Sequence, residues 1–375
     1  MIYFDNAATT YKKPLSVKLS TLLALQKYSA NPGRSGHKLS LKTAEKIFET
    51  RVRVADFFNC PKIENVIFTK NCTEALNIAI LGSVKENGNV ITSCFEHNSV
   101  LRPLKELENK NKITLTIVSP KNNTNITLED IKEKVKSNTY LICVNHISNV
   151  TGNKNNINDI GKFCKEKNIL FLVDVAQSAG HKKINMEKQN INFLCFAGHK
   201  GLFSPQGIGG LCINTDKLPK ALTFGGTGTS SKDLSQPTTL PEYYESGTLS
   251  TPLIIGLNSG IKYVDKNFNK IKIKTEKLTK TLYNELSKLK DIILYTDKKS
   301  CYGVISFNIK NKTSTDVANL LNEKFNIAVR SGLHCAPLAH NFLGTTEQGT
   351  VRISLNHFNN IFEIKKFIKA IKTLI

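Results

Sequence analysis

Short apolar runs alternate with amphipathic segments between about residue 63 and residue 214. The apolar runs predict β-strands at residues 66–69, 89–93, 113–119, 139–148, 169–177, 193–199 and 207–214. The amphipathic segments predict helices at residues 73–86, 98–111, 127–137 and 158–168, of which the third opens with a capping Thr127. Apolar strands that alternate with helices indicate a mostly parallel sheet covered by helices on both faces. The predicted fold class is therefore α/β.

Polar side chains lie at or near the ends of three of the predicted strands. They occur in the stretches "CVNHISN", "LVDVAQ" and "CFAGHK", which carry Asn149, Asp174 and Lys200. In open parallel sheets, ligands bind at the carboxyl ends of the strands. The sequence therefore predicts a binding site at this edge of the sheet.

A polar segment separates the predicted sheet from a second unit. Residues 215–252 are rich in Gly, Ser, Thr and Pro, and loops of this length are usually functional or disordered. A helical stretch follows at residues 252–290. The rest of the chain predicts an α+β unit with strands at residues 292–296, 303–309 and 351–355 and an amphipathic closing helix at residues 359–375.

The chain is strongly basic, with 52 Lys and Arg against 30 Asp and Glu and a formal net charge of +22. Such a charge suits a nucleic-acid partner. However, only six of the basic residues are arginine, and the lysines are spread along helical faces instead of forming a stripe interleaved with aromatic residues. We therefore interpret the charge as a solvated, lysine-rich surface and expect no nucleic-acid partner.

No apolar run reaches the roughly 18 residues that a membrane span needs, so we expect no membrane partner. The first residues lack a basic segment followed by an apolar one, so we expect a cytoplasmic location. The nine cysteines contain no C-x-x-C pair, and their number is odd, so we expect neither a metal site nor a disulfide framework. Eight of them suit a buried core.

Cys335 differs because it lies in the polar stretch "SGLHCAPLAH". A helix is expected to begin near Ala336, and Arg330 and His334 are close in sequence. A helix start and nearby cations lower the pKa of a thiol. From these residues alone, Cys335 is either an incidental exposed thiol or a nucleophile.

Two glycine-rich stretches, "GGTGTSSK" and "GIGGL", resemble phosphate loops only superficially. Neither has the spacing of a nucleotide-binding motif, so a nucleotide enzyme is disfavoured.

Asp174 and Lys200 form a more informative pair. Singly, Asp174 could cap a helix or join a buried ion pair, and Lys200 could extend its amine to solvent. Together, at neighbouring strand ends, they match the chemistry of pyridoxal phosphate (PLP), in which a lysine bonds covalently to the cofactor and an aspartate keeps its pyridine nitrogen protonated.

An ordered set of motifs extends this match over nearly the whole chain. The motifs are "YFDNAATTYKKP", "FTKNCTEALN", "FEHNSVLRP", "NHISNVTG", "DVAQSAGHK", "FAGHKGLFSPQGIGGL", "YESGTLSTP", "VRSGLHCAPLAH" and "GTVRISLNHFN". They resemble those of class V aminotransferase-fold enzymes, in the cysteine desulfurase and selenocysteine lyase branch with a short cysteine loop. The resemblance implies PLP-dependent transferase fold type I, like aspartate aminotransferase, and a homodimer. It also implies a large domain of residues 14–255 and a small α+β domain of residues 1–13 and 256–375.

The resemblance implies a role for each polar residue at the strand ends. Lys200 would hold the cofactor and later move the α-proton of the substrate, and Asp174 would pair with the pyridinium. Gln177 would bond the phenolic oxygen of the cofactor. His97 would lie over the ring as an acid–base group, or alternatively cap the following helix. Asn149 would orient the oxygen end of the cofactor, or alternatively serve only in a turn.

The same resemblance assigns the phosphate group. It would lie at the start of the helix begun by "NCTEALN", with N–H groups from Cys72 and Thr73 and the Thr73 hydroxyl. His199 of the same chain, together with Thr248 of the partner subunit, would complete this site.

The chain departs from the family at two positions. Ala197 stands where a hydroxyl residue is usual, and Asn71-Cys72 stands where Gly-Thr is frequent. We therefore expect one phosphate hydrogen bond fewer.

The substrate residues follow from the last two motifs. Cys335 would be the sulfur-accepting nucleophile, and Arg330 and Arg352, with Asn149, would bind the substrate, Arg352 through its carboxylate. The expected activity is conversion of L-cysteine to L-alanine through a persulfide on Cys335, with sulfur passed to an acceptor protein, for example in iron–sulfur cluster assembly. The alternatives are a selenocysteine lyase acting on L-selenocysteine, an aminotransferase that does not use Cys335, and a degenerate, non-catalytic binding protein.

Overall fold

The computed structural model of the chain describes residues 1–33, 35–121, 125–229, 232–298 and 301–375. Its largest element is a seven-stranded sheet in the order β2-β8-β7-β6-β5-β3-β4. The strands are β2 (Val66–Thr69), β3 (Gly88–Ser93), β4 (Ile113–Val118), β5 (Thr139–Asn145), β6 (Leu170–Asp174), β7 (Phe193–Ala197) and β8 (Gly209–Ile213). Strand β8 is antiparallel to both of its neighbours, β2 and β7, and the other strand pairs of this sheet are parallel. The prediction of a mostly parallel α/β sheet is confirmed.

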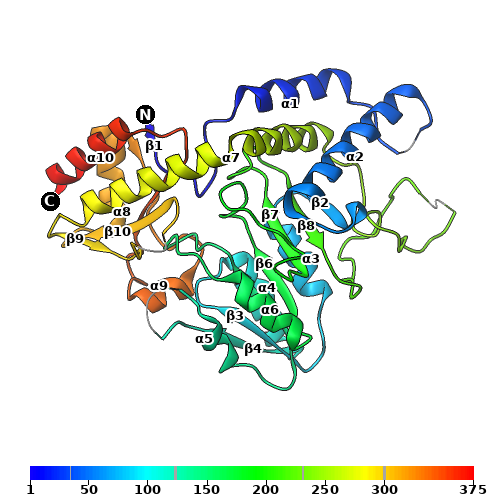
Figure 1. Ribbon diagram of the computed structural model, residues 1–375, viewed down its shortest axis with the longest axis horizontal. Coiled ribbons are helices and arrows are strands. Elements are labelled where there is room, and N and C mark those ends of the chain that lie inside the picture. The colour runs from blue at the N-terminus through cyan, green and yellow to red at the C-terminus, as the bar shows by residue number, and fades with distance from the viewer. Residues whose placement is uncertain (34, 122–124, 230–231, 299–300) are drawn as a thin grey trace.

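Helices cover both faces of this sheet (Figure 1). Successive residues of one strand belong to different cores: Val173 packs in the core that includes α2 and α6, whereas Leu172 packs in the core that includes α3 and α4. Burial on both faces explains why these strands are apolar throughout. The helices are α2 (Lys38–Phe58), α3 (Cys72–Gly82), α4 (Asn98–Asn109), α5 (Leu128–Lys132) and α6 (Ile157–Glu166).

Helix α5 is shorter than the helix predicted at residues 127–137. Thr127 caps it as predicted: its side chain accepts a hydrogen bond from the N–H of Asp130, in a full capping box. Beyond Lys132 the segment has a single apolar residue, Val135, so no apolar face continues to hold the helix on the sheet.

A second, three-stranded antiparallel sheet has the order β12-β10-β9. It packs with the end of α7 (Thr251–Leu286) and with α8 and α10 in a separate core. In Figure 1, α7 runs from the large sheet to this unit, and α1 (Leu15–Lys27) lies along its first half. The remaining elements are β9 (Ile292–Leu294), β10 (Val304–Ile309), α8 (Ser314–Phe325), α9 (Pro337–Leu343), β12 (Val351–Ser354) and α10 (Ile361–Leu374).

The first residues of the chain join this second unit. Strand β1 (Ile2–Tyr3) pairs in parallel with β11 (Ile327–Ala328). Helix α7 is continuous across the domain boundary proposed near residue 255, so that boundary stays a prediction. No helix in the described ranges is both long enough and apolar enough to cross a membrane.

The cysteines are all free, and seven of them are buried. The expectation of eight core cysteines was wrong for Cys301, which is only partly buried. Cys301 lies before β10, where the chain enters the sheet from the surface, and not within the strand itself.

Candidate active site

The predicted residues come together around a cavity of about 230 Å³ at the carboxyl ends of the central strands. Its wall includes Cys72, Thr73, His97, Asn149, Asp174, Gln177, His199, Lys200, Arg330 and Arg352. Ala197 and Ser99 also line it. Thr248 and Cys335 are not part of this wall.

Asp174 ends β6 with its carboxylate buried. Its Oδ1 accepts hydrogen bonds from the N–H of Ala176, at 2.8 Å, and from the thiol of Cys72, at 3.6 Å. Burial raises the pKa of Asp174, while these bonds and the charge of Lys200 act in the opposite direction. Among the described residues no hydrogen bond reaches Oδ2, so this oxygen is available to a cation in the cavity.

Lys200 follows β7 and is half-buried at the cavity wall. Burial lowers the pKa of its amine, although Asp174 and Cys72 partly oppose the shift. A desolvated amine of this kind is a suitable nucleophile toward a carbonyl group. The prediction that Lys200 differs from the surface lysines therefore rests on its burial and on its proximity to Asp174.

Two glycines hold the Lys200 segment against the Asp174 segment. A Cβ atom on Gly201 would lie 2.2 Å from the carbonyl oxygen of Ala179, and one on Gly180, at φ +82°, would lie 2.1 Å from the carbonyl oxygen of Gly201. Only glycine permits this approach.

The N-terminal segment fixes the same region from the other side. The Thr10 hydroxyl donates to the carbonyl oxygen of Lys200 at 2.9 Å, and the Lys13 amine donates to that of His199 at 2.8 Å. The Thr9 hydroxyl lies 3.0 Å from Nδ1 of His199. Gln177 donates from Nε2 to the carbonyl oxygen of Ala7 at 3.1 Å.

The start of α3 offers an anion site. Asn71 caps the helix and accepts a hydrogen bond from the N–H of Glu74. Within the described part of the chain, the N–H groups of Cys72 and Thr73 donate to no protein acceptor, and both residues line the cavity. Free N–H groups at a helix start favour a phosphate.

His97 is the N-cap of α4, and its Nδ1 accepts a hydrogen bond from the N–H of Ser99 at 3.0 Å. The capping alternative is therefore correct for this side chain, which lines the cavity as well. The Ser99 hydroxyl lies 2.9 Å from Nδ1 of His97 and 2.7 Å from the Thr73 hydroxyl. Burial, with a contribution from Lys200, lowers the pKa of His97 to about 4, so its ring is neutral at neutral pH. Burial likewise lowers the pKa of His199 to about 4.

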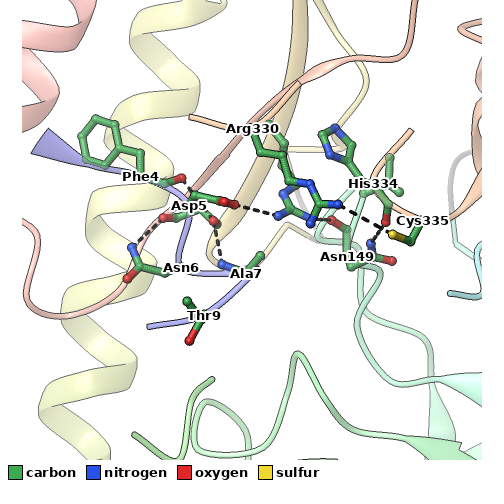
Figure 2. Close-up of polar contacts among 12 residues, drawn as sticks. Phe4, Asp5, Asn6, Ala7, Thr9, Asn149, Arg330, His334 and Cys335 are labelled. Carbon is green, nitrogen blue, oxygen red and sulfur yellow. Dashed lines mark hydrogen bonds and ion pairs between the residues drawn. The ribbon is translucent and has the colours of Figure 1, made fainter. Parts of the chain in front are cut away.

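Cys335 lies beside the cavity in a tightly held turn just before α9. Both His334 and Cys335 have positive φ angles, of 49° and 58°. Asn149 donates from Nδ2 to the carbonyl oxygen of His334 at 2.7 Å, and Arg330 lies 3.6 Å from the Cys335 sulfur (Figure 2). Cys335 as a residue is partly exposed, which leaves it open to the approach of a partner thiol.

Arg352 is fully buried in β12 and reaches the cavity. Its guanidinium donates to the Asn149 carbonyl oxygen at 3.0 Å and forms an ion pair with Asp5 at 2.8 Å. Sequence reasoning assigned no role to Asp5 or Ser99. The signal for Asp5 was a carboxylate directly after the apolar run "IYF", and Ser99 had no signal beyond its place next to a candidate histidine.

Thr248 is exposed and lies away from this cavity. It borders a separate, mainly apolar hollow of about 490 Å³ between the loop before α7 and helix α2. Its predicted role requires a second subunit.

A parallel α/β sheet with a lysine, an aspartate and an open helix start at one cavity defines a PLP-dependent transferase of fold type I. The Aminotransferase class-V family model matches residues 2–367, and the chain belongs to this family.

Known proteins with cysteine desulfurase names are similar over the full length. The probable cysteine desulfurase of Pyrococcus abyssi is 36% identical, over 100% of this chain and 94% of the relative. The probable cysteine desulfurase of Methanothermobacter thermautotrophicus is 34% identical, over 97% of this chain and 92% of the relative. The solved apo structure of the cysteine desulfurase from Thermococcus onnurineus NA1 is 35% identical and superposes with a TM-score of 0.93, over 100% of this chain and 94% of the other.

The cavity fits the cofactor of this family. The open N–H groups of Cys72 and Thr73 suit a phosphate, the free oxygen of Asp174 suits a protonated pyridine nitrogen, and the desolvated amine of Lys200 suits an aldehyde. Among the described residues no cluster of His, Cys, Asp and Glu could hold a metal ion.

Proposed function

We propose that this protein is a PLP-dependent cysteine desulfurase that converts L-cysteine to L-alanine and passes the sulfur to an acceptor protein. The observation that carries the proposal is Cys335: a partly exposed thiol beside the Lys200 cavity, with a guanidinium 3.6 Å from its sulfur. An aminotransferase would need no such thiol. The similarity to proteins named cysteine desulfurases supports the same conclusion.

The residues around the cavity would have separate roles in this reaction. When bound, the cofactor withdraws electrons from the α-carbon of the substrate and prepares the substrate sulfur for transfer. Lys200 is placed to take the α-proton and to return it to the α-carbon after the Cβ–S bond has broken, since burial favours the neutral form of its amine. Asp174 would hold the pyridine nitrogen, Gln177 the phenolic oxygen, and Cys72, Thr73 and His199 the phosphate.

The sulfur step uses Cys335. Its thiolate attacks the substrate sulfur, so an S–S bond forms as the Cβ–S bond breaks. The electron pair of the broken bond remains on Cβ, which takes a proton and becomes the methyl group of L-alanine. The resulting persulfide passes its outer sulfur to the thiol of an acceptor. Arg330 stabilises negative charge on sulfur, and Arg330, Arg352 and Asn149 bind the substrate.

We further propose a homodimer. Thr248 is exposed beside the apolar hollow, and α1 carries exposed leucines toward solvent. A second subunit that covers this surface would place its own segment against the neighbouring cavity, so that Thr248 of the partner subunit completes the phosphate site. This arrangement explains why Thr248 does not reach the cavity of its own chain.

The direct test compares wild type with Cys335→Ala and Cys335→Ser, assayed for L-alanine formed from L-cysteine in the presence of a thiol acceptor. Both variants should lose desulfuration while keeping the visible absorption of bound cofactor, which Lys200→Ala should lose. Full alanine formation by Cys335→Ala would disprove the persulfide mechanism. A colourless wild-type protein would indicate a non-catalytic binding protein, and a faster reaction with L-selenocysteine would indicate a selenocysteine lyase.

A further inference from the structure

Two arginines at the substrate end of the cavity face each other across a β-bridge. The N–H of Arg352 donates to the carbonyl oxygen of Arg330 at 2.7 Å, and the N–H of Arg330 donates to that of Arg352 at 3.2 Å. Like charges directly opposite each other in a sheet are destabilising. Both side chains line the cavity, so an arrangement that keeps the two guanidinium groups apart is needed.

Asp5 provides the compensating charge for one of them. Its Oδ1 lies 2.8 Å from an N–H nitrogen of Arg352, and the side chains of the pair are 1% and 21% exposed for Arg352 and Asp5. The second terminal nitrogen of Arg352 donates to the Asn149 carbonyl oxygen at 3.0 Å. Asp5 itself does not line the cavity, so it holds Arg352 from behind.

The main chain around Asp5 is fixed to the strand that carries Arg352. Ser354, two residues further along β12, donates its N–H to the Phe4 carbonyl oxygen at 2.6 Å. Its hydroxyl accepts from the Ala7 N–H at 2.8 Å, and its carbonyl oxygen accepts from the Asn6 side chain, also at 2.8 Å. These bonds surround Asp5, so the position of its carboxylate relative to Arg352 is set by the backbone and does not depend on a flexible contact.

We propose that Asp5 is a positioning residue for substrate binding: it holds the Arg352 guanidinium at the cavity wall, where the N–H groups left over bind the substrate carboxylate. By drawing Arg352 toward itself, Asp5 also leaves Arg330 to contact the Cys335 sulfur. This inference rests on the proposed function. A guanidinium offers five N–H donors, and Asp5 and Asn149 each take one, so donors remain for a carboxylate.

A role for Asp5 as a competitor of the substrate predicts the opposite change in KM from a role as a positioning residue. If Asp5 merely competed with the substrate for Arg352, its removal would strengthen substrate binding. If it positions Arg352, its removal weakens binding. The sign of the change in KM therefore decides between the two.

The kinetic test uses Asp5→Asn, which keeps the shape and the hydrogen-bond acceptor but removes the charge. We expect its KM for L-cysteine to rise about tenfold, the loss of one charge-assisted contact, with kcat within about twofold and the cofactor absorption unchanged. Asp5→Glu, which restores the charge on a longer side chain, should recover part of the loss. A KM that is unchanged or lower in Asp5→Asn would overturn the proposal.

A second measurement does not depend on turnover. Iodoacetate carries a carboxylate and iodoacetamide does not. The rate of Cys335 alkylation by iodoacetate divided by the rate for iodoacetamide, each followed by peptide mass, therefore reports how well the site holds a carboxylate. The ratio should fall about threefold to tenfold in Asp5→Asn if Asp5 positions Arg352, and rise if Asp5 only cancels positive charge. Asp291→Asn, an exposed position in a 4.0 Å pair with Lys310, removes the same charge elsewhere and should leave the ratio unchanged. If wild type fails to turn over L-cysteine, the proposed function fails, whereas this ratio still decides the role of Asp5.

Discussion

The main-chain N–H of Asn98 donates a hydrogen bond of 2.7 Å to the carbonyl oxygen of Cys335. Asn98 is the first residue of α4, directly after His97. This bond therefore joins the turn that carries Cys335 to the helix that positions His97, the candidate acid–base group. Because the sulfur must meet a substrate held in the adjoining cavity, the position of this turn matters to the rate of sulfur transfer.

Asn98→Pro removes this one hydrogen bond with little other effect. Proline lacks the N–H but is favoured in the first helical position, and His97, at φ −68° and ψ 153°, already has the extended conformation that proline requires before it. The loss of about 1 kcal/mol should lower kcat for alanine formation about fivefold, with cofactor absorption unchanged. Asn98→Ala keeps the N–H and should behave like wild type; equal rates for both variants would show that the bond does not matter.

Arg330→Gln should reduce the reactivity of Cys335. The guanidinium lies 3.6 Å from the sulfur, and a cation at this distance holds the sulfur in place and attracts the negative charge that it carries when it attacks. Alkylation of Cys335 by iodoacetamide at pH 7 should slow about threefold to tenfold, measured by peptide mass. Arg330→Lys should retain part of the rate. Arg102→Gln, at an exposed position on α4, serves as the control for loss of the same charge.

His97 should stay neutral through the working pH range. Burial lowers its pKa from about 6.5 to about 4, so protonation occurs only as the pH falls through about 4. His97→Asn, which retains a helix-capping side chain, should lower kcat about tenfold or more yet leave the shape of the pH profile between pH 5 and 8 unchanged. An inflection near pH 6.5 that is present in wild type and absent in the variant would contradict this assignment.

The strands and the candidate cavity residues were predictable because their signals are local. A strand buried on both faces must be apolar throughout, and a charged side chain such as Asp174 at its end stands out against that run. The antiparallel direction of β8 has no such signal, since an apolar strand looks the same in either direction.

The contacts that support the site were not predictable from the sequence pattern. Asp5 meets Arg352, Thr10 meets Lys200, and Asn98 meets Cys335 across long stretches of chain, and each pair depends on the tertiary arrangement of segments that are distant in sequence. The role of His97 could not be settled from the sequence either. The residues around it suited a helix cap or a cavity residue, and in the structure His97 is both.

Glu96→Gln should stabilise the protein increasingly as the pH rises. Glu96 is completely buried, and its Oε2 has no hydrogen-bond partner among the residues that the structure describes. Burial raises the pKa of Glu96 to about 8 from 4.5. The folded state therefore keeps a proton that the unfolded state releases above about pH 4.5, so wild-type stability falls as the pH rises toward 8. Relative to wild type, the variant should gain about 1–3 kcal/mol of unfolding free energy between pH 5 and pH 7.5, measured by urea unfolding.

Glu187→Gln, at an exposed position, is the matched control and should show no such pH-dependent gain. A gain for Glu96→Gln that shrinks as the pH rises would mean that Glu96 is ionised in the folded protein.

Ala197→Ser should tighten cofactor binding. Ala197 ends β7, is 2% exposed and lines the cavity with Cys72 and Thr73, so a hydroxyl there would add a donor beside the open N–H groups of α3. One further hydrogen bond of about 1 kcal/mol should lower the Kd for pyridoxal phosphate about fivefold, measured by titrating cofactor-depleted protein and following its absorption. Ala197→Val adds bulk without a donor and should bind no more tightly than wild type. If the serine variant also shows no gain, the phosphate does not lie against β7, and its proposed site at the start of α3 must be moved.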